Sequence, residues 1–142
     1  MWKIFPTLAL LIGGCSAESP PSSIPAARSS DPCSTDVVEP INVSLAALLA
    51  NPERYEGRSV AVIGFLHQSL EHSAIYSHRE DYVQTITPNG LWVSGATIPE
   101  ALNDRYARVE GIFTTTETGH LNQWSGAICN IGRATPWGRD AP

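Results

Sequence analysis

The segment RSVAVIGFLHQS, at residues 58–69, constrains the fold more than any other part of this chain. Apolar residues occupy both of its faces, which is typical of a strand that is buried on both sides. Gly64 interrupts the run and indicates a bulge, a sharp bend or a close approach of another backbone. A strand that curls around a small barrel needs such a point. We therefore expect residues 58–69 to be the first strand of a barrel.

Four further strands are expected after it, each bounded by turn residues or loops. They cover residues 73–78, 90–95, 106–116 and 123–132. A two-turn helix is expected to begin after Ser44, its N-cap, and to end before Pro52, because the residue before a proline resists the helical conformation. Residues 97–105 favour a second short helix, whereas SHREDY at 77–82 is typical of a solvated, charged turn.

This order of elements predicts a mainly β fold, a small five-stranded OB-like barrel. A short helix precedes the first strand and another separates strands three and four. An open β-sandwich and an SH3-like barrel are the alternatives. Residues 33–137 would form the barrel domain, since about a hundred residues suffice for one core and not for two. Residues 138–142 would be a tail.

The N-terminus predicts secretion. Residues 1–14 combine one early lysine, a short apolar run and two glycines, the pattern of a signal peptide. The tetrapeptide IGGC that ends at Cys15 resembles the lipobox of bacterial lipoproteins. The resemblance implies that Cys15 is lipidated and begins the mature chain. With Ser16 after it, the resemblance also implies an outer-membrane lipoprotein that faces the periplasm or the surface. An ordinary signal peptide, cut near Ala17, is the alternative.

Residues 15–32 are expected to join this lipid to the domain as a flexible tether, because serine, proline and alanine leave almost nothing apolar to bury. The membrane is then a partner through the acyl chains on Cys15, which can anchor a protein without any transmembrane helix. The formal net charge of −5 argues against nucleic acid as a second partner.

Two cysteines remain, Cys33 at the entrance of the domain and Cys129 in its last apolar run. In an oxidising periplasm such a pair is most simply interpreted as a disulfide. The alternative is a buried Cys129 with Cys33 left as a free thiol.

Three stretches of the chain carry a resemblance to a known group. They are SLAALLANPERYEGRSVAVIGFL, GLWVSG and YARVEGIFTTTETGHLNQWSGAICNI, and the resemblance covers about two thirds of the chain. They look like uncharacterised bacterial lipoproteins and periplasmic proteins with an OB-like barrel domain. The resemblance implies this fold and an envelope location. It implies no activity, no cofactor and no catalytic residue.

The candidate ligand face consists of loop residues. In an OB barrel the loop between strands one and two and the loop between strands four and five border the same face. His67, His72 and, less centrally, His78 fall at the first loop, and His120 falls in the second. Trp124 at the end of the second loop is a candidate for stacking on sugars or bases. The other tryptophan near a strand end, Trp92, is expected in the core because large apolar residues are mostly buried.

No catalytic motif is present, and the histidine spacing matches no recognised metal site. The sequence therefore predicts a lipid-anchored envelope protein that binds an envelope protein or a glycan without catalysis and without a cofactor. The alternative is a metal-binding protein or metal-dependent enzyme that uses His67, His72 and His120. Solvated loop histidines are the simpler interpretation of these side chains, and a purely structural envelope lipoprotein is a third alternative for the function.

Overall fold

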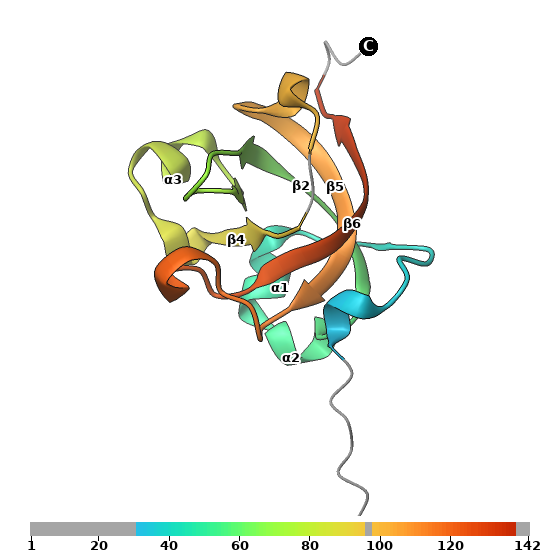
Figure 1. The fold of residues 1–142 in the computed structure, drawn as a ribbon. Coiled ribbons are helices and arrows are strands. Elements are labelled where there is room, and N and C mark those ends of the chain that lie inside the picture. The colour runs from blue at the N-terminus through green and yellow to red at the C-terminus, as the bar shows by residue number, and fades with distance from the viewer. Residues whose placement is uncertain (1–30, 96–97, 139–142) are drawn as a thin grey trace, which may run out of the picture.

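The protein is described by a computed structural model that covers residues 31–95 and 98–138. The expected signal peptide, Cys15, nearly all of the tether and residues 139–142 lie outside the described residues. The described part is a closed barrel of five strands with one extra strand at its edge (Figure 1). The strands are β1 (Ile41–Asn42), β2 (Ser59–His67), β3 (Ala74–Tyr76), β4 (Gly90–Val93), β5 (Arg105–Thr114) and β6 (Ala127–Pro136).

The barrel closes in the order β2, β3, β4, β6, β5 and back to β2. All of these pairs are antiparallel except β4 with β6, which is parallel. The predicted OB-like barrel is therefore confirmed. The extra strand β1 runs parallel to β2 at Val60 and Ala61, before the point where β3 begins to pair with β2.

At Gly64 the backbone of β2 passes close to the neighbouring strand β3. A Cβ atom at this position would lie 2.4 Å from the carbonyl oxygen of Tyr76 and 2.8 Å from Cγ1 of Ile75. β2 pairs with β5 along most of its length and with β3 only from Phe65 onwards. The predicted close backbone approach is thus present where β2 turns from one barrel wall into the next, and only glycine leaves room for it.

Two short helices, α1 (Leu45–Ala50) and α2 (Pro52–Tyr55), lie across one end of the barrel (Figure 1). The hydroxyl oxygen of Ser44 accepts a hydrogen bond from the amide of Ala47, so the predicted N-cap is confirmed. Leu45 and Leu48 are buried in the barrel core. Pro52 ends α1 as expected, but it also begins α2, because a proline fits the first turn of a helix.

The charged segment 77–82 is not the solvated turn that its composition suggests. It contains most of α3 (Arg79–Val83), and Asp81 within it is buried. Its carboxylate accepts hydrogen bonds from the side-chain amide of Asn89, at 2.8 Å, and from the amide of His78. A satisfied carboxylate can be buried, and here it ties α3 to the turn that precedes β4.

The remaining helical segments are single turns. They are η1 (Pro32–Ser34), η2 (Thr87–Asn89), η3 (Glu100–Leu102) and η4 (His120–Asn122). The helix expected over residues 97–105 is thus reduced to η3, between β4 and β5. None of the helices in the described residues is long and apolar enough to cross a bilayer.

Cys33 and Cys129 form the predicted disulfide, with their Cα atoms 5.5 Å apart. The bond holds η1 against β5 and β6. Ile112 lies on the same face of β5 as the partly exposed Arg108 and Glu110, yet only 1% of its surface is exposed, and it pairs with the disulfide-bonded Cys129.

Candidate functional site

The two faces of the β3–β4 wall carry different sets of side chains, because successive residues of a strand point to opposite sides. Ile75, Leu91 and Val93 belong to the main core inside the barrel. Tyr76 and Trp92 point the other way and form a second, smaller cluster with Trp124 and Tyr82. We call the side chains on this outer face the aromatic cluster; its members are His67, His72, Tyr76, Tyr82, Trp92 and Trp124.

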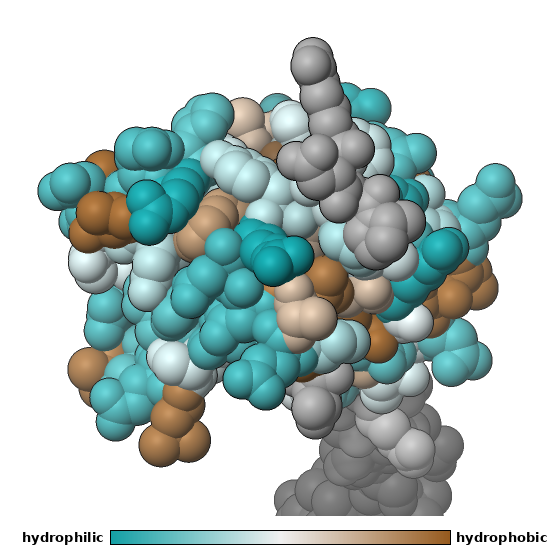
Figure 2. Space-filling model, turned by 90° about the horizontal axis from the view of Figure 1, so that it is seen from above, coloured by the Kyte–Doolittle hydropathy of each residue, from teal (hydrophilic) through white to brown (hydrophobic). Residues whose placement is uncertain are grey.

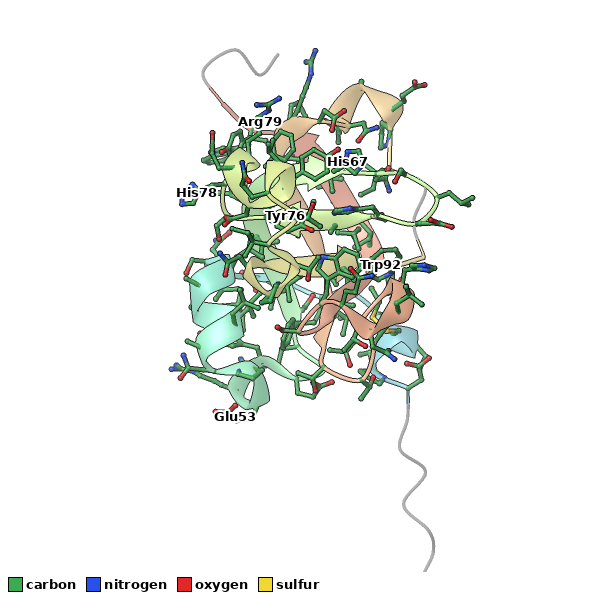
Figure 3. The ribbon with its side chains drawn as sticks, turned by 90° about the vertical axis from the view of Figure 1, so that its left-hand side faces the viewer. Glu53, His67, Tyr76, His78, Arg79 and Trp92 are labelled. Carbon is green, nitrogen blue, oxygen red and sulfur yellow. A yellow bond between two sulfur atoms is a disulfide. The ribbon has the colours of Figure 1, made fainter. Side chains whose placement is uncertain are left out.

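The aromatic cluster draws on parts of the chain that are far apart in sequence. Figure 3 shows His67, Tyr76 and Trp92 on the same side of the molecule, on the neighbouring strands β2, β3 and β4. The ring of His72, from the loop after β2, lies 5.3 Å from that of His67 and 5.2 Å from that of Trp124. Trp124 comes from the loop after β5. The structure therefore brings the β2–β3 loop and the β5–β6 loop together.

A chain of hydrogen bonds runs through the cluster. The indole N–H of Trp124 donates to the hydroxyl oxygen of Tyr76 at 3.1 Å, and that hydroxyl lies 2.8 Å from Nε2 of His72. Trp124 can only donate, so the hydroxyl proton of Tyr76 is the one available for Nε2. His72 is then neutral, with its proton on Nδ1. Because Tyr76 is fully buried, the opposite arrangement would leave its hydroxyl proton without an acceptor.

The ionisation of these groups agrees with this assignment. Burial lowers the pKa of His72 from its ordinary value, and the nearby His67 lowers that pKa further. Burial raises the pKa of Tyr76, with Asp81 and Tyr82 adding to the rise and the hydrogen bond from Trp124 opposing it. Both groups are therefore held in their neutral forms.

His67 is held differently. Its Nδ1 lies 2.7 Å from the carboxylate of Asp104, and its ring stacks on Tyr82 with ring centres 4.3 Å apart. Next to it, the side chain of Asn103 accepts a hydrogen bond from the amide of Gln68 and donates one to the carbonyl of Gln68. These contacts fix the start of the β2–β3 loop to the turn before β5.

A groove lies beside the aromatic cluster. It consists of two adjoining hollows of about 410 and 680 Å³ that share Leu70, Trp92 and Glu117. Ser69, Ser73, Ser94, Thr118, His120 and Asn122 are among the polar residues that line one hollow or the other. We call this feature the tryptophan groove. Its walls are the same two loops that the sequence places at the ligand face of an OB barrel.

The β5–β6 loop that forms one wall is internally braced. Ser94 on the strand side donates a hydrogen bond to the carboxylate of Glu117, and Thr118 donates to the side-chain oxygen of Asn122. Gly119 has a φ of 68°, and a Cβ atom there would lie 2.5 Å from Cδ2 of Trp92. The loop backbone therefore packs directly on the indole ring, which only glycine permits.

The expected site residues are only partly brought together. His67, His72 and Trp124 lie in the aromatic cluster, whereas His120 lines the tryptophan groove. His78 lies at the start of α3, on another part of the surface (Figure 3).

The two tryptophans exchange their expected roles. Trp124 is only 4% exposed and cannot serve as a stacking surface, while Trp92 is partly exposed and lines both hollows. The sequence reasoning also missed Glu117 and Leu70. Both residues belong to the two loops that border the ligand face of an OB barrel, and this position in the sequence could have identified them.

Within residues 31–95 and 98–138, no group of three His, Cys, Asp or Glu side chains is arranged to hold a metal ion. The two histidines that do meet are already engaged, His67 with Asp104 and His72 with Tyr76. The metal-binding alternative therefore has no preformed site in the part of the chain that is described.

Exposed apolar surface is scattered. Seen from above, hydrophilic side chains cover most of the molecule and hydrophobic ones stand in small, separate groups (Figure 2). Leu70, beside the groove, is 97% exposed. No broad apolar docking face is visible from this side.

No family model matches the chain, and comparisons with curated proteins and with solved structures gave no significant match. The resemblance to bacterial lipoproteins with an OB-like barrel stays a prediction. Any proposal of function therefore rests on the sequence, the barrel and the groove.

Proposed function

We propose that this protein is a lipid-anchored envelope protein whose barrel binds an envelope protein or glycan through the tryptophan groove, without catalysis. The anchor rests on the lipobox-like sequence that ends at Cys15. The binding role rests on one observation: Trp92, a large aromatic side chain, is partly exposed in a groove between the two loops that OB barrels use for recognition.

The construction of the groove supports binding rather than chemistry. Its single carboxylate among the described lining residues, Glu117, accepts a hydrogen bond from Ser94, and the only histidine among them is His120. The hydroxyl of Ser94 is bonded to Glu117, but among the contacts described no third side chain orients this carboxylate, and His120 has no described hydrogen bond to a hydroxyl or thiol, so the oriented nucleophile and base of covalent catalysis are not assembled. A fixed aromatic surface with a polar rim is instead the usual composition of a recognition site.

The test is photo-cross-linking in intact bacteria. A photoreactive amino acid replaces Leu70 in the groove or, as the control, exposed Glu53 on α2, which Figure 3 shows far from Trp92. We expect position 70 to give discrete cross-linked protein bands or material retained on isolated cell walls, and position 53 to give neither. Equal cross-linking at both positions would refute the binding role.

The anchor is tested separately by labelling with palmitate. The wild-type protein should incorporate the label and the Cys15→Ala variant should not. Incorporation that does not depend on Cys15, or no incorporation at all, would refute the lipid anchor while leaving the groove to be judged by its cross-links.

A further inference from the structure

Trp92 is held rigidly from behind, while part of its surface faces the groove. Its ring centre lies 4.9 Å from that of Trp124, whose own N–H is tied to buried Tyr76. The backbone at Gly119 closes a further side of the indole. A side chain that is already immobile loses little conformational entropy on binding, so this surface is preorganised for a flat, apolar ligand face.

The shape of the groove fits an extended occupant. The two hollows meet at Trp92 and Leu70, and each has a volume in the range of small-ligand sites, about 300–1,000 Å³. An occupant that crosses Trp92 would therefore continue on both sides of it. The rim carries short hydroxyl and amide side chains, which can both donate and accept hydrogen bonds. These are Ser69, Ser73, Ser94, Thr118 and Asn122.

The charge of the groove disfavours anionic polymers. Glu117 lines both hollows, and no lysine or arginine is among the lining residues described. A phosphate or uronate group would meet this carboxylate without a fixed positive charge to offset it. A neutral ligand avoids this repulsion, and its hydroxyl groups can donate hydrogen bonds to Glu117.

A peptide that binds by adding a strand is also disfavoured. Strand addition needs an exposed sheet edge, but β4, which carries Trp92, pairs with β3 on one side and with β6 on the other. The groove therefore offers an aromatic surface and polar side chains rather than a free backbone edge.

From these features we propose that the tryptophan groove binds an uncharged glycan, with one pyranose ring stacked on Trp92. The C–H face of a pyranose is apolar and packs on an indole, while its equatorial hydroxyls point outward, toward the polar rim. Leu70 flanks the stacked ring, and Glu117 accepts a hydroxyl proton. This inference rests on the proposed binding function and names the class of its ligand.

The test measures oligosaccharide binding to the full chain in a detergent that has no sugar headgroup. The probes are the neutral tetrasaccharides of β-1,4-linked N-acetylglucosamine, β-1,4-linked glucose and α-1,4-linked glucose, with a hyaluronan tetrasaccharide as the anionic comparison. We expect at least one neutral probe to bind with a dissociation constant of about 0.1–1 mM, seen by calorimetry and by a shift in tryptophan fluorescence. The anionic probe should bind at least about tenfold more weakly.

The variants locate the binding. Trp92→Ala should weaken it about tenfold or more, whereas Trp92→Phe should retain most of it because the aromatic face remains. Glu117→Gln should weaken it about threefold and reduce the discrimination against the anionic probe. Trp137→Ala is the matched control, because Trp137 is an exposed tryptophan, at 53%, that lines neither hollow.

Three results would overturn the inference. The first is that no neutral probe shows saturable binding at about 10 mM. The second is that Trp92→Ala and Trp137→Ala lose equal affinity for the probe, and the third is that the anionic probe binds more tightly than the neutral ones. If the neutral probes do not bind while position 70 still cross-links to an envelope protein, the assignment of a glycan ligand is wrong and the proposed binding function stands. If both fail, the groove is not a binding site.

Discussion

The disulfide should contribute a large share of the domain's stability. Cys33 and Cys129 are 96 residues apart in sequence, and the loop they close contains β1 to β5 and the start of β6. In the chain-entropy model, closing a loop of this length removes conformational freedom from the unfolded chain worth about 4.7 kcal/mol at 25 °C. Small domains have a net stability of only about 5–15 kcal/mol.

The perturbation is the double substitution Cys33→Ala and Cys129→Ala. Alanine is preferred to serine, because Cys129 is 3% exposed and a hydroxyl there would be buried. We expect the free energy of unfolding to fall by about 4–5 kcal/mol and the melting temperature to fall by roughly 20 °C.

The assay is urea unfolding of the oxidised wild type, the reduced wild type and the double variant, followed by tryptophan fluorescence. The reduced wild type and the double variant should agree within about 1 kcal/mol, because both lack the cross-link. The unfolding slope should be steeper without the disulfide, since the open chain exposes more surface on unfolding. A loss below about 2 kcal/mol in both proteins would refute the loop-entropy reasoning.

Packing and the pKa of His72 give three more testable expectations. Gly64→Ala should destabilise the domain by about 1–3 kcal/mol, since the backbone of Tyr76 blocks the new methyl group. The control is Gly95→Ala, which has no atom within 4 Å of the new methyl group and should cost only the strain of its positive φ. Equal losses of unfolding free energy for the two variants in urea would contradict the proposed clash. Leu48→Ala should cost about 2–5 kcal/mol in the same assay, because Leu48 is fully buried where α1 meets the barrel core, and a loss below about 1 kcal/mol would contradict that packing. The pKa of His72 is lowered in the fold, so the unfolded chain takes up its proton first as the pH falls, and stability should fall as pH drops below about 6.5. His72→Asn should flatten the dependence of the unfolding free energy on pH. An unchanged pH dependence would refute the lowered pKa of His72.

Local signals predicted the parts of the fold that depend on local physics. Ser44 was recognisable as a cap because its hydroxyl satisfies an amide of the helix that follows, whatever the rest of the chain does. Gly64 stood out because a glycine in the middle of an apolar strand usually marks a bulge, a bend or a close backbone approach. The order of strands then selected the barrel, since a chain of this size has few ways to bury strands on both sides.

Features that depend on distant contacts were not predictable from the sequence. Asp81 has the local sequence of a solvated acid until its partner Asn89 is placed beside it. The exposures of Trp92 and Trp124 were assigned the wrong way round, because strand sequence suggests burial and loop sequence suggests exposure. In the fold the loop residue packs against both Tyr76 and His72, and the strand residue is left at the edge of the cover.

This exchange accounts for the position of the candidate site. The outer face of β3 and β4 is too apolar to be left in water, so α3 covers part of it with Tyr82 and the β5–β6 loop covers another part with Trp124. The cover stops at Trp92, which Gly119 contacts without enclosing. A side chain at position 119 would not extend the cover, because its Cβ atom would lie 2.5 Å from Cδ2 of the indole. An aromatic surface that is supported on its inner side and left open on its outer side is more costly to maintain than a closed one, and the proposed ligand would offset that cost by completing the cover.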